Sequence, residues 1–107
     1  MQTMIKHNIK LPPNQLAEYC RRWMIDELAF FGSVLRDDFD STSDLDILVK
    51  FKLTANWSLL DHTRMEQELS QVLGRQIDLF SKRAVEQSHN WIRRQEILNT
   101  AKVVYAA

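Results

Sequence analysis

The sequence predicts an α+β fold in which a small mixed β-sheet is covered by helices. Short apolar runs typical of buried strands are interspersed with amphipathic stretches that have helical spacing, in the order helix, strand, strand, helix, strand, helix. The 107 residues include only two glycines and two prolines, which is typical of one core without long flexible linkers. We therefore expect residues 1–107 to form a single domain.

The first half of the chain predicts one helix and two strands. The helix is expected in residues 11–25, where Pro12 and Pro13 precede an N-cap at Asn14. Its apolar stripe consists of Leu16, Tyr19, Cys20 and Trp23. An apolar run over residues 27–33 predicts a buried strand that ends at a glycine. Residues 44–51 alternate as a second strand, with one face formed by Leu45, Ile47, Val49 and Phe51 and the other by Asp44, Asp46, Leu48 and Lys50.

The second half predicts a long helix, a strand and a C-terminal helix. Residues 56–75 are strongly amphipathic and stop at Gly74, with an inward stripe of Leu60, Met65, Leu69, Val72 and Leu73. Residues 75–81 predict a short strand with Ile77 and Leu79 on one face and Asp78 on the other. From about Gln87 onward we expect helix, with a docking stripe of Ile97, Ala101, Val104 and Tyr105.

Composition narrows the class of protein. Lys plus Arg and Asp plus Glu number 14 each, so the formal net charge is zero. Proteins that bind nucleic acid through its phosphates are usually basic, and no direct nucleic-acid binding is expected.

The single cysteine, Cys20, cannot form an internal disulfide and is expected to be a small buried side chain. No apolar run has the length of a membrane span and no secretory signal pattern is present, so we expect a cytoplasmic protein.

Three aspartates form a candidate metal site. Asp44 and Asp46 are two residues apart on one strand, so their side chains share a face with Cα atoms about 6.5 Å apart. Asp78 occupies one face of another strand, and if the two strands are neighbours the three carboxylates meet. Clustered carboxylates repel one another and raise one another's pKa unless a cation lies between them. Mg²⁺ prefers a few carboxylates together with substrate phosphates, and a pair of ions supports phosphoryl-type transfer.

A candidate phosphate site precedes the aspartates. Gly32 and Ser33 follow an apolar strand and begin a possible helical turn, where a glycine lets the backbone approach a phosphate closely. Ser33 can add its hydroxyl, and Arg36 can contact a phosphate or pair with a neighbouring aspartate. Each piece alone is common on surfaces and in turns. Their combination in this order, with apolar flanks on both sides, favours a nucleotide site.

The motif "GSVLRDDFDSTSDLDILV", residues 32–49, resembles the signature of the DNA polymerase β-type nucleotidyltransferases. In its short length the chain is similar to the minimal nucleotidyltransferases, the antitoxin half of HEPN/MNT toxin–antitoxin pairs. The resemblance implies the palm-like fold of that superfamily. It assigns Gly32 and Ser33 to the nucleotide phosphates. It also makes Asp44 and Asp46 the metal-binding pair.

The resemblance extends to two further positions. Asp78 matches the third carboxylate, which acts as a metal ligand or as the base for the attacking hydroxyl. Arg36 matches a frequent arginine of this loop, although many relatives have a glycine next. Here Asp37 and Asp38 follow, and these two residues, with Asp40, are expected to be solvated loop residues.

We expect a nucleotidyltransferase that uses Mg²⁺, in two ions, to transfer a nucleoside monophosphate to a hydroxyl. The resemblance implies that ATP is the substrate, that the acceptor is a tyrosine of a cognate HEPN ribonuclease toxin, and that AMPylation silences the toxin. Two alternatives remain: an antitoxin that masks its partner sterically, and a small-molecule nucleotidyltransferase.

Three further features have no assigned role at this point. The basic segment 81–94 is either a solvated helix start or a contact for the triphosphate or an acidic partner. Trp23, Trp57 and Trp91 are expected to be core or interface anchors. His62 and Glu66, four apart on the long helix, are expected to make surface or partner contacts.

Overall fold

The structure is a computed structural model that describes residues 9, 11–35 and 43–107. Its elements, in chain order, are α1 (Pro13–Arg22), β1 (Ile25–Phe31), the 3₁₀ turn η1 (Gly32–Leu35), β2 (Leu45–Phe51), α2 (Leu59–Leu73), β3 (Ile77–Ser81), α3 (Lys82–Glu86), α4 (Trp91–Thr100) and β4 (Lys102–Ala106). The sheet order is β3-β2-β1-β4. β1 is antiparallel to β2 and β4, while β2 and β3 are parallel and connected through α2. The predicted mixed sheet of an α+β fold is confirmed.

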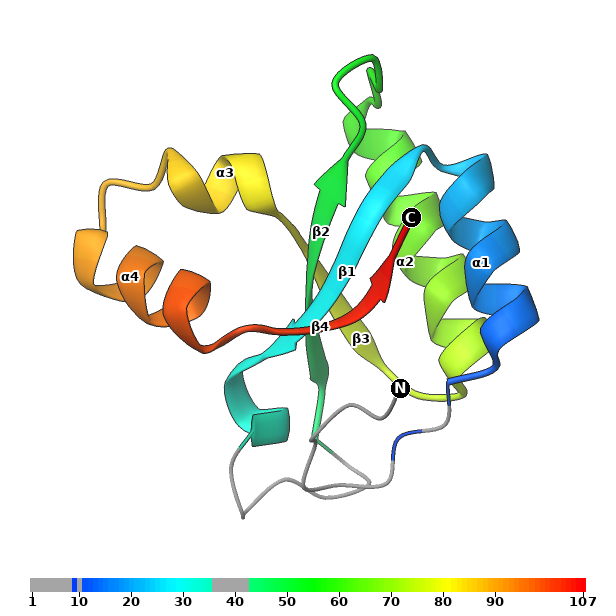
Figure 1. Ribbon diagram of the computed structural model, residues 1–107, viewed down its shortest axis with the longest axis horizontal. Helices are drawn as coiled ribbons and strands as arrows, with labels where there is room; N and C mark the ends of the chain where they lie inside the picture. The colour runs from blue at the N-terminus through cyan, green and yellow to red at the C-terminus, as the bar shows by residue number, and fades with distance from the viewer. Residues whose placement is uncertain (1–8, 10, 36–42) are drawn as a thin grey trace.

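Helices cover both faces of the sheet. Figure 1 shows α1 and α2 side by side on one face and α3 with α4 on the other. The strands therefore bury side chains on both sides. Leu45, Ile47 and Val49 of β2 are fully buried in the larger cluster with α1 and α2, and Leu48 is buried in a smaller cluster with Val85 and Ile97. The predicted alternation of β2 is correct, and its second face is apolar where α3 and α4 cover it.

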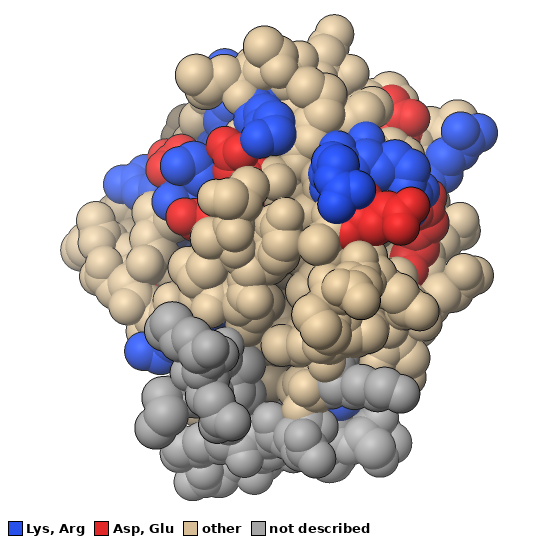
Figure 2. Space-filling view, turned by 45° about the vertical axis from the view of Figure 1, so that its right-hand side comes forward, with Lys and Arg blue, Asp and Glu red and all other residues tan. Residues whose placement is uncertain are grey.

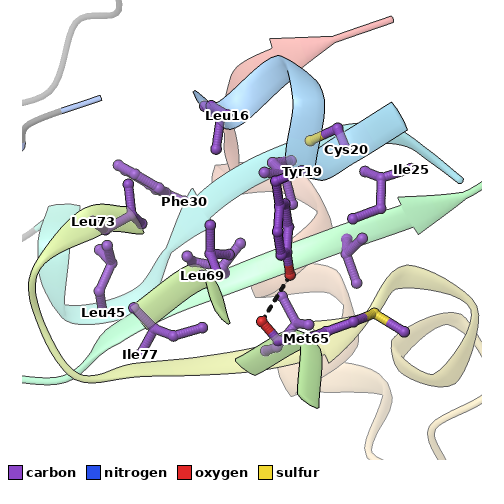
Figure 3. Close-up of a cluster of buried hydrophobic side chains, with 14 of the residues drawn as sticks. Leu16, Tyr19, Cys20, Ile25, Phe30, Leu45, Met65, Leu69, Leu73 and Ile77 are labelled. Carbon is purple, nitrogen blue, oxygen red and sulfur yellow. Dashed lines mark hydrogen bonds between the residues drawn. The ribbon is translucent and has the colours of Figure 1, made fainter. Parts of the chain in front are cut away.

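The larger cluster includes one buried polar group that is satisfied. The hydroxyl of Tyr19 donates a hydrogen bond of 2.9 Å to the backbone carbonyl of Met65, which ties α1 to α2 (Figure 3). Cys20 is fully buried beside it, as predicted, and burial raises the pKa of its thiol to about 12. Such a thiol stays protonated at neutral pH and acts only as a packing group.

The start of α1 differs from the prediction. The helix begins at Pro13, with Pro12 in the N-cap position and no side-chain cap, so the prediction of Asn14 as N-cap is wrong. Proline suits the first helical turn because its fixed φ is already helical and its missing N–H would have no intrahelical acceptor there. The two prolines therefore open this helix within its first turn, rather than ending the chain segment before it.

Helix α2 has well-defined ends. Ser58 caps it in a reciprocal capping box with Asp61, and Gly74 ends it in the left-handed conformation at φ +69°. The prediction of Gly74 as the stop is confirmed. Met65, Leu69 and Leu73 face the core, but Leu60 is 62% exposed, so its predicted inward position is wrong. Leu60 lies in the first turn of α2, whereas the buried residues of the helix begin at Met65.

The C-terminal segment is a strand where helix was predicted. α4 ends at Thr100, and residues 102–106 pair antiparallel with β1, with Leu28 opposite Tyr105 and Ala29 opposite Val103. Two valines and a tyrosine favour extended structure. The backbone groups of residues 102–106 find hydrogen-bond partners along the side of β1 that does not face β2. The helical stripe predicted through Val104 and Tyr105 is therefore wrong, although Ile97 does pack into the core.

The three tryptophans have different environments. Trp23 and Trp57 pack edge to face with ring centroids 5.0 Å apart, and the Trp57 indole donates to the Trp23 carbonyl. They anchor the loop before α2 to the end of α1, as predicted. Trp91 is 62% exposed at the start of α4 and is no core anchor.

The charged surface is mixed in sign. On the face shown in Figure 2, basic and acidic side chains lie next to one another in two groups. The Arg22–Glu68 ion pair of 2.7 Å, between α1 and α2, and the Lys52–Asp26 pair of 2.9 Å are of this kind. Within the described part of the chain, no helix is both long and apolar enough to cross a membrane.

Candidate active site

Two of the predicted metal-binding aspartates lie side by side. Asp46 of β2 and Asp78 of β3 are register partners in the parallel pair, so their Cα atoms are roughly 4.8 Å apart and their side chains share the α3–α4 face. Asp44 precedes β2 by one residue and is exposed. The Leu45 amide donates to the Gln76 carbonyl at 3.1 Å, which fixes the start of β2 against the start of β3. The three aspartates therefore gather where β2 and β3 begin.

Gly32 packs directly against one of these carboxylates. It has φ +74°, a conformation that side chains rarely adopt. A Cβ at this position would lie 2.5 Å from Oδ2 of Asp46. The glycine predicted to admit a phosphate thus already has its backbone against the Asp46 side chain. Any other residue would push this carboxylate away or change the turn.

Ser33 connects the same turn to the other aspartate of the pair. Its hydroxyl donates a hydrogen bond of 3.3 Å to the backbone carbonyl of Asp44. The Gly32–Ser33 segment is thereby held against both ends of the Asp-x-Asp motif. This explains the spacing in the sequence: the motif lies beside the glycine because β1 and β2 are antiparallel, with Phe31 opposite Asp46.

The surroundings of Asp78 disfavour its charge. Burial raises the pKa of the Asp78 carboxyl, and the negative charges of Asp44 and Glu66 raise it further. A raised pKa is what we predicted for clustered carboxylates without a cation. The negative charges of Asp44 and Glu66 that raise it also attract a divalent cation to this position.

Glu66 of α2 lies next to the site, although the sequence predicted only surface or partner contacts for it and His62. Its carboxylate accepts a hydrogen bond of 2.8 Å from the backbone N–H of Leu79, while His62 Nε2 lies 2.9 Å from the Leu79 carbonyl and must donate to it. These two side chains bind the outward-facing peptide groups of β3 and so fix the strand that carries Asp78. Their i, i+4 spacing was visible in the sequence, but their target on another element was not.

The donor chemistry of the aspartates fits Mg²⁺. Carboxylate oxygens on neighbouring strands, with a glycine that leaves room for substrate phosphates, are the ligands this ion prefers. Among the residues that the structure describes, no three acidic, histidine or cysteine side chains converge closely enough to hold an ion by themselves. Asp44, Asp46 and Asp78 as ligands therefore stay a prediction.

An aromatic pair lies beside the carboxylates on the same face. Phe31, opposite Asp46, and Phe80, two residues after Asp78, pack edge to face with centroids 5.3 Å apart. The guanidinium of Arg93 from α4 lies 6.0 Å from the centre of the Phe80 ring. On the side of α3 and α4 the carboxylates thus have this aromatic pair as neighbours, with Arg93 over one of its rings.

Some predicted residues cannot be placed. Arg36 lies outside the described residues, as do the predicted solvated residues Asp37, Asp38 and Asp40. The described part of the predicted turn forms η1, which confirms a helical turn directly after Gly32.

Comparison with known proteins points to one family. The model of the Nucleotidyltransferase domain family matches residues 13–104, from the start of α1 into β4. Relatives named as protein adenylyltransferases are among the matches. One "Putative protein adenylyltransferase" of Methanocaldococcus jannaschii is 35% identical over 77 residues, which are 72% of this chain and 76% of that protein. Protein adenylyltransferase MntA of Thermococcus cleftensis is 35% identical over 69 residues, 64% of this chain and 68% of that protein.

Solved structures share the fold. The structure of a "putative minimal nucleotidyltransferase" has a TM-score of 0.61 at 32% identity and covers 82% of this chain and 86% of that one. A chain from the complex of the tri-AMPylated HEPN toxin of Shewanella oneidensis with its MNT antitoxin has a TM-score of 0.58 at 20% identity, over 88% of this chain and 69% of that one. From the family match and the geometry of its sheet, this chain belongs to the nucleotidyltransferase domain family and has the fold of the minimal nucleotidyltransferases.

Proposed function

We propose that this protein is a Mg²⁺-dependent protein adenylyltransferase of the cytoplasm that transfers AMP from ATP to a tyrosine hydroxyl of a cognate HEPN ribonuclease toxin. It would act as the antitoxin of that pair. The observation that carries the proposal is the packing of the Gly32 backbone against the Asp46 carboxylate, with Asp78 in register on the next strand. In this proposal residues 1–107 act as one catalytic domain.

The relatives support the choice of reaction and partner. Proteins 35% identical to this chain carry the name protein adenylyltransferase. The Shewanella oneidensis antitoxin of the same fold was captured with a HEPN toxin that bears AMP groups. We transfer both the reaction and the partner class to this chain as part of the proposal.

The site residues have distinct roles in the proposed reaction. In this proposal the amides of the η1 turn and Arg36 bind the β- and γ-phosphates, and the Ser33 hydroxyl, which donates to the Asp44 carbonyl in the structure, turns to donate to them. Asp44, Asp46 and Asp78 hold Mg²⁺, in two ions. When bound, Mg²⁺ neutralises the triphosphate and the charge that develops on the leaving oxygen.

The proposed chemical step is a single displacement at phosphorus. The acceptor oxygen forms a bond to the α-phosphorus, and the bond from that phosphorus to the bridging oxygen of the β-phosphate breaks. Pyrophosphate leaves with the electron pair. The acceptor's proton passes to the Asp78 carboxylate, which acts as the general base. The products are the AMP ester of the hydroxyl and pyrophosphate.

The proposal is tested by asking whether inhibition of the partner outlasts this protein. The partner is treated with this protein, ATP and Mg²⁺, repurified under denaturing conditions, refolded, and assayed for RNA cleavage and intact mass. We expect an inactive product that is heavier by one or more AMP units, because a phosphodiester does not dissociate. A sample handled in the same way without ATP is the control.

The alternatives give different results. Full recovery of cleavage with no added mass, together with inhibition before denaturation, indicates steric masking and contradicts the AMPylation proposal. AMP transfer to a small molecule, with no effect on the partner, indicates a small-molecule nucleotidyltransferase instead.

A further inference from the structure

A cavity next to the candidate site has no role in the proposed reaction. It has a volume of about 180 Å³ and lies between the end of β3 and helices α3 and α4. Its floor is apolar, formed by Phe80, Ala84, Val85 and Ile97, and two arginines stand at its walls. Pockets for whole small molecules are usually about 300–1,000 Å³. This cavity therefore suits one side chain or one ring system.

The cavity lies on the side from which the acceptor must approach. Gly32 and Ser33 follow β1, whereas Asp78 is on β3, and β2 with Asp46 lies between them. In phosphoryl-type transfer the attacking and leaving oxygens are roughly in line through phosphorus. If pyrophosphate leaves over Gly32 and Ser33, the attacking hydroxyl enters from the side of β3.

The floor of the cavity continues from the proposed base. Phe80 is two residues after Asp78, so both side chains share a face, and their Cα atoms are roughly 6.6 Å apart. β3, the strand of Asp78, leads directly into α3, and α4 lies beside α3 (Figure 1). A residue seated in the cavity thus lies close to a hydroxyl that attacks beside Asp78.

The charged residues that line the cavity are all basic, which favours an acidic group on the partner. None of the lining residues is acidic. Arg94 Nη1 donates to the Ser88 carbonyl at 2.8 Å and holds the loop between α3 and α4. Arg93 contacts the face of Phe80, and among the described residues it has no carboxylate partner. Its exposed guanidinium is available to a carboxylate on another molecule.

Two large apolar side chains are exposed at the start of α4, the helix that also carries Arg93. Trp91 and Ile92 are each 62% exposed and precede Arg93 in the first turn of the helix. Tryptophan and arginine are among the residue types that carry most binding energy in protein interfaces. A free nucleotide would not need this additional surface, but a folded acceptor protein would.

We propose that the cavity and the first turn of α4 form the docking site for the acceptor protein, in which an apolar side chain of the acceptor fills the cavity and a neighbouring acidic residue pairs with Arg93. The inference rests on the proposed function and specifies how that function selects its substrate. Arg93 and Ala84 are then specificity residues that do not touch the reacting atoms.

Two substitutions test the docking site independently. Arg93→Glu replaces the attraction for a carboxylate by repulsion, and Arg64→Glu on α2, across the sheet, is its matched control for charge. Ala84→Leu places a larger side chain at the cavity, and Ala84→Ser is its control for size. Thermal melting checks that each variant is folded, and if Ala84→Leu does not fold, Arg93→Glu decides alone.

Steady-state AMP transfer is measured with the partner protein and with ATP varied separately. We expect Arg93→Glu and Ala84→Leu to raise the KM for the partner about tenfold or more, as the loss of one good interface contact would. The KM for ATP and the affinity for a non-hydrolysable ATP analogue should stay unchanged, and both controls should behave like the wild type. Reversing one acidic residue of the partner to lysine should restore transfer by Arg93→Glu.

Other outcomes overturn the inference. An unchanged KM for the partner excludes this docking site, and a rise in the KM for ATP alone identifies the cavity as a nucleobase pocket. If the wild type transfers no AMP, the proposed function fails, while direct binding of the partner to the same variants still tests the docking site. An unchanged dissociation constant for Arg93→Glu in that binding experiment rejects it.

Discussion

At the scale of single residues, Gly32 does two things that only glycine permits. Its backbone has φ +74°, and the space where a Cβ would stand is occupied by the Asp46 carboxylate. Gly74, which ends α2, has nearly the same conformation at φ +69° but nothing within 4 Å of its virtual Cβ. Both glycines are needed for the positive φ, but only at Gly32 does a neighbouring side chain also leave no room for a Cβ.

Alanine substitution of the two glycines should have unequal effects. Gly74→Ala should lower the free energy of unfolding by about 1 kcal/mol through backbone strain alone. Gly32→Ala carries the same strain and must also displace Asp46, so we expect a larger loss and, in addition, the loss of nucleotide binding and AMP transfer. Urea unfolding and calorimetry with an ATP analogue measure both effects. Equal behaviour of the two variants would contradict the close packing of Gly32 on Asp46.

Asp78 should make the metal-free protein less stable as pH rises. Its pKa is raised above the ordinary 3.8 by burial and by Asp44 and Glu66. Between the unfolded and the folded pKa the folded state holds more protons, so stability falls with increasing pH through that interval and stays lower above it. Asp78→Asn removes this loss, so the variant should melt higher than the wild type at neutral pH and lose transfer activity.

The difference between the two melting curves isolates Asp78 from other titrating groups. Asp61, for example, has a lowered pKa because the Ser58 backbone N–H and hydroxyl donate to it. Its contribution to stability is therefore lost as pH falls, which is opposite to the effect of Asp78. The melting temperature of Asp78→Asn minus that of the wild type should grow as pH rises from about 4. A difference that shrinks with pH would mean that the Asp78 carboxylate is stabilised by the fold.

At the scale of elements, α2 stabilises β3 through side chains as well as through the core. Glu66 and His62 bind the N–H and the carbonyl of Leu79, which point away from β2. Strand edges otherwise present unpaired peptide groups. The strand that carries Asp78 is thus fixed by β2 on one side and by α2 on the other.

Removal of the Glu66 carboxylate should loosen this strand. Glu66→Ala leaves the Leu79 amide without its acceptor, and we expect a loss of about 1–3 kcal/mol in the free energy of unfolding. Glu66→Gln keeps an acceptor oxygen at the same position and is the matched control. It should be as stable as the wild type or slightly more stable, since it also relieves repulsion with Asp78. Similar losses in both variants would show that charge, not the hydrogen bond, matters here.

The sequence predicted those elements whose own pattern decides their structure. The alternation of β2, the amphipathic face of α2 and its stop at Gly74 are local properties, and they are correct. The strand at residues 102–106 depends on the open side of β1, which is more than 70 residues away in sequence and invisible to a local pattern. The exposure of Leu60 and the contact of Glu66 with β3 likewise depend on where the helix lies relative to the sheet.

The candidate site was predictable for a related reason. Gly32, Ser33, Asp44 and Asp46 are close in sequence, and one antiparallel strand pair brings them together. Asp78 required the further assumption that its strand neighbours β2, which the parallel pairing confirms. The cavity beside Phe80 needed the position of α4, so the sequence indicated only a basic segment there.

At the scale of the whole molecule, a formal net charge of zero coexists with a local excess of negative charge at the start of β2 and β3. A bound cation therefore has a favourable effect on the entire fold, and its affinity can be read from stability.

Mg²⁺ should raise the melting temperature of the wild type. At ten times its dissociation constant, an ion that binds only the folded state stabilises it by about 1.4 kcal/mol, which corresponds to roughly 6 °C in a domain of this size. Asp44→Asn combined with Asp46→Asn removes ligands and repulsion together. This double variant should melt at or above the wild type without metal and should not respond to Mg²⁺.

NaCl at matched ionic strength controls for screening. An equal response of both proteins to Mg²⁺ would place the ion elsewhere, and collapse of the double variant would make the two aspartates structural residues.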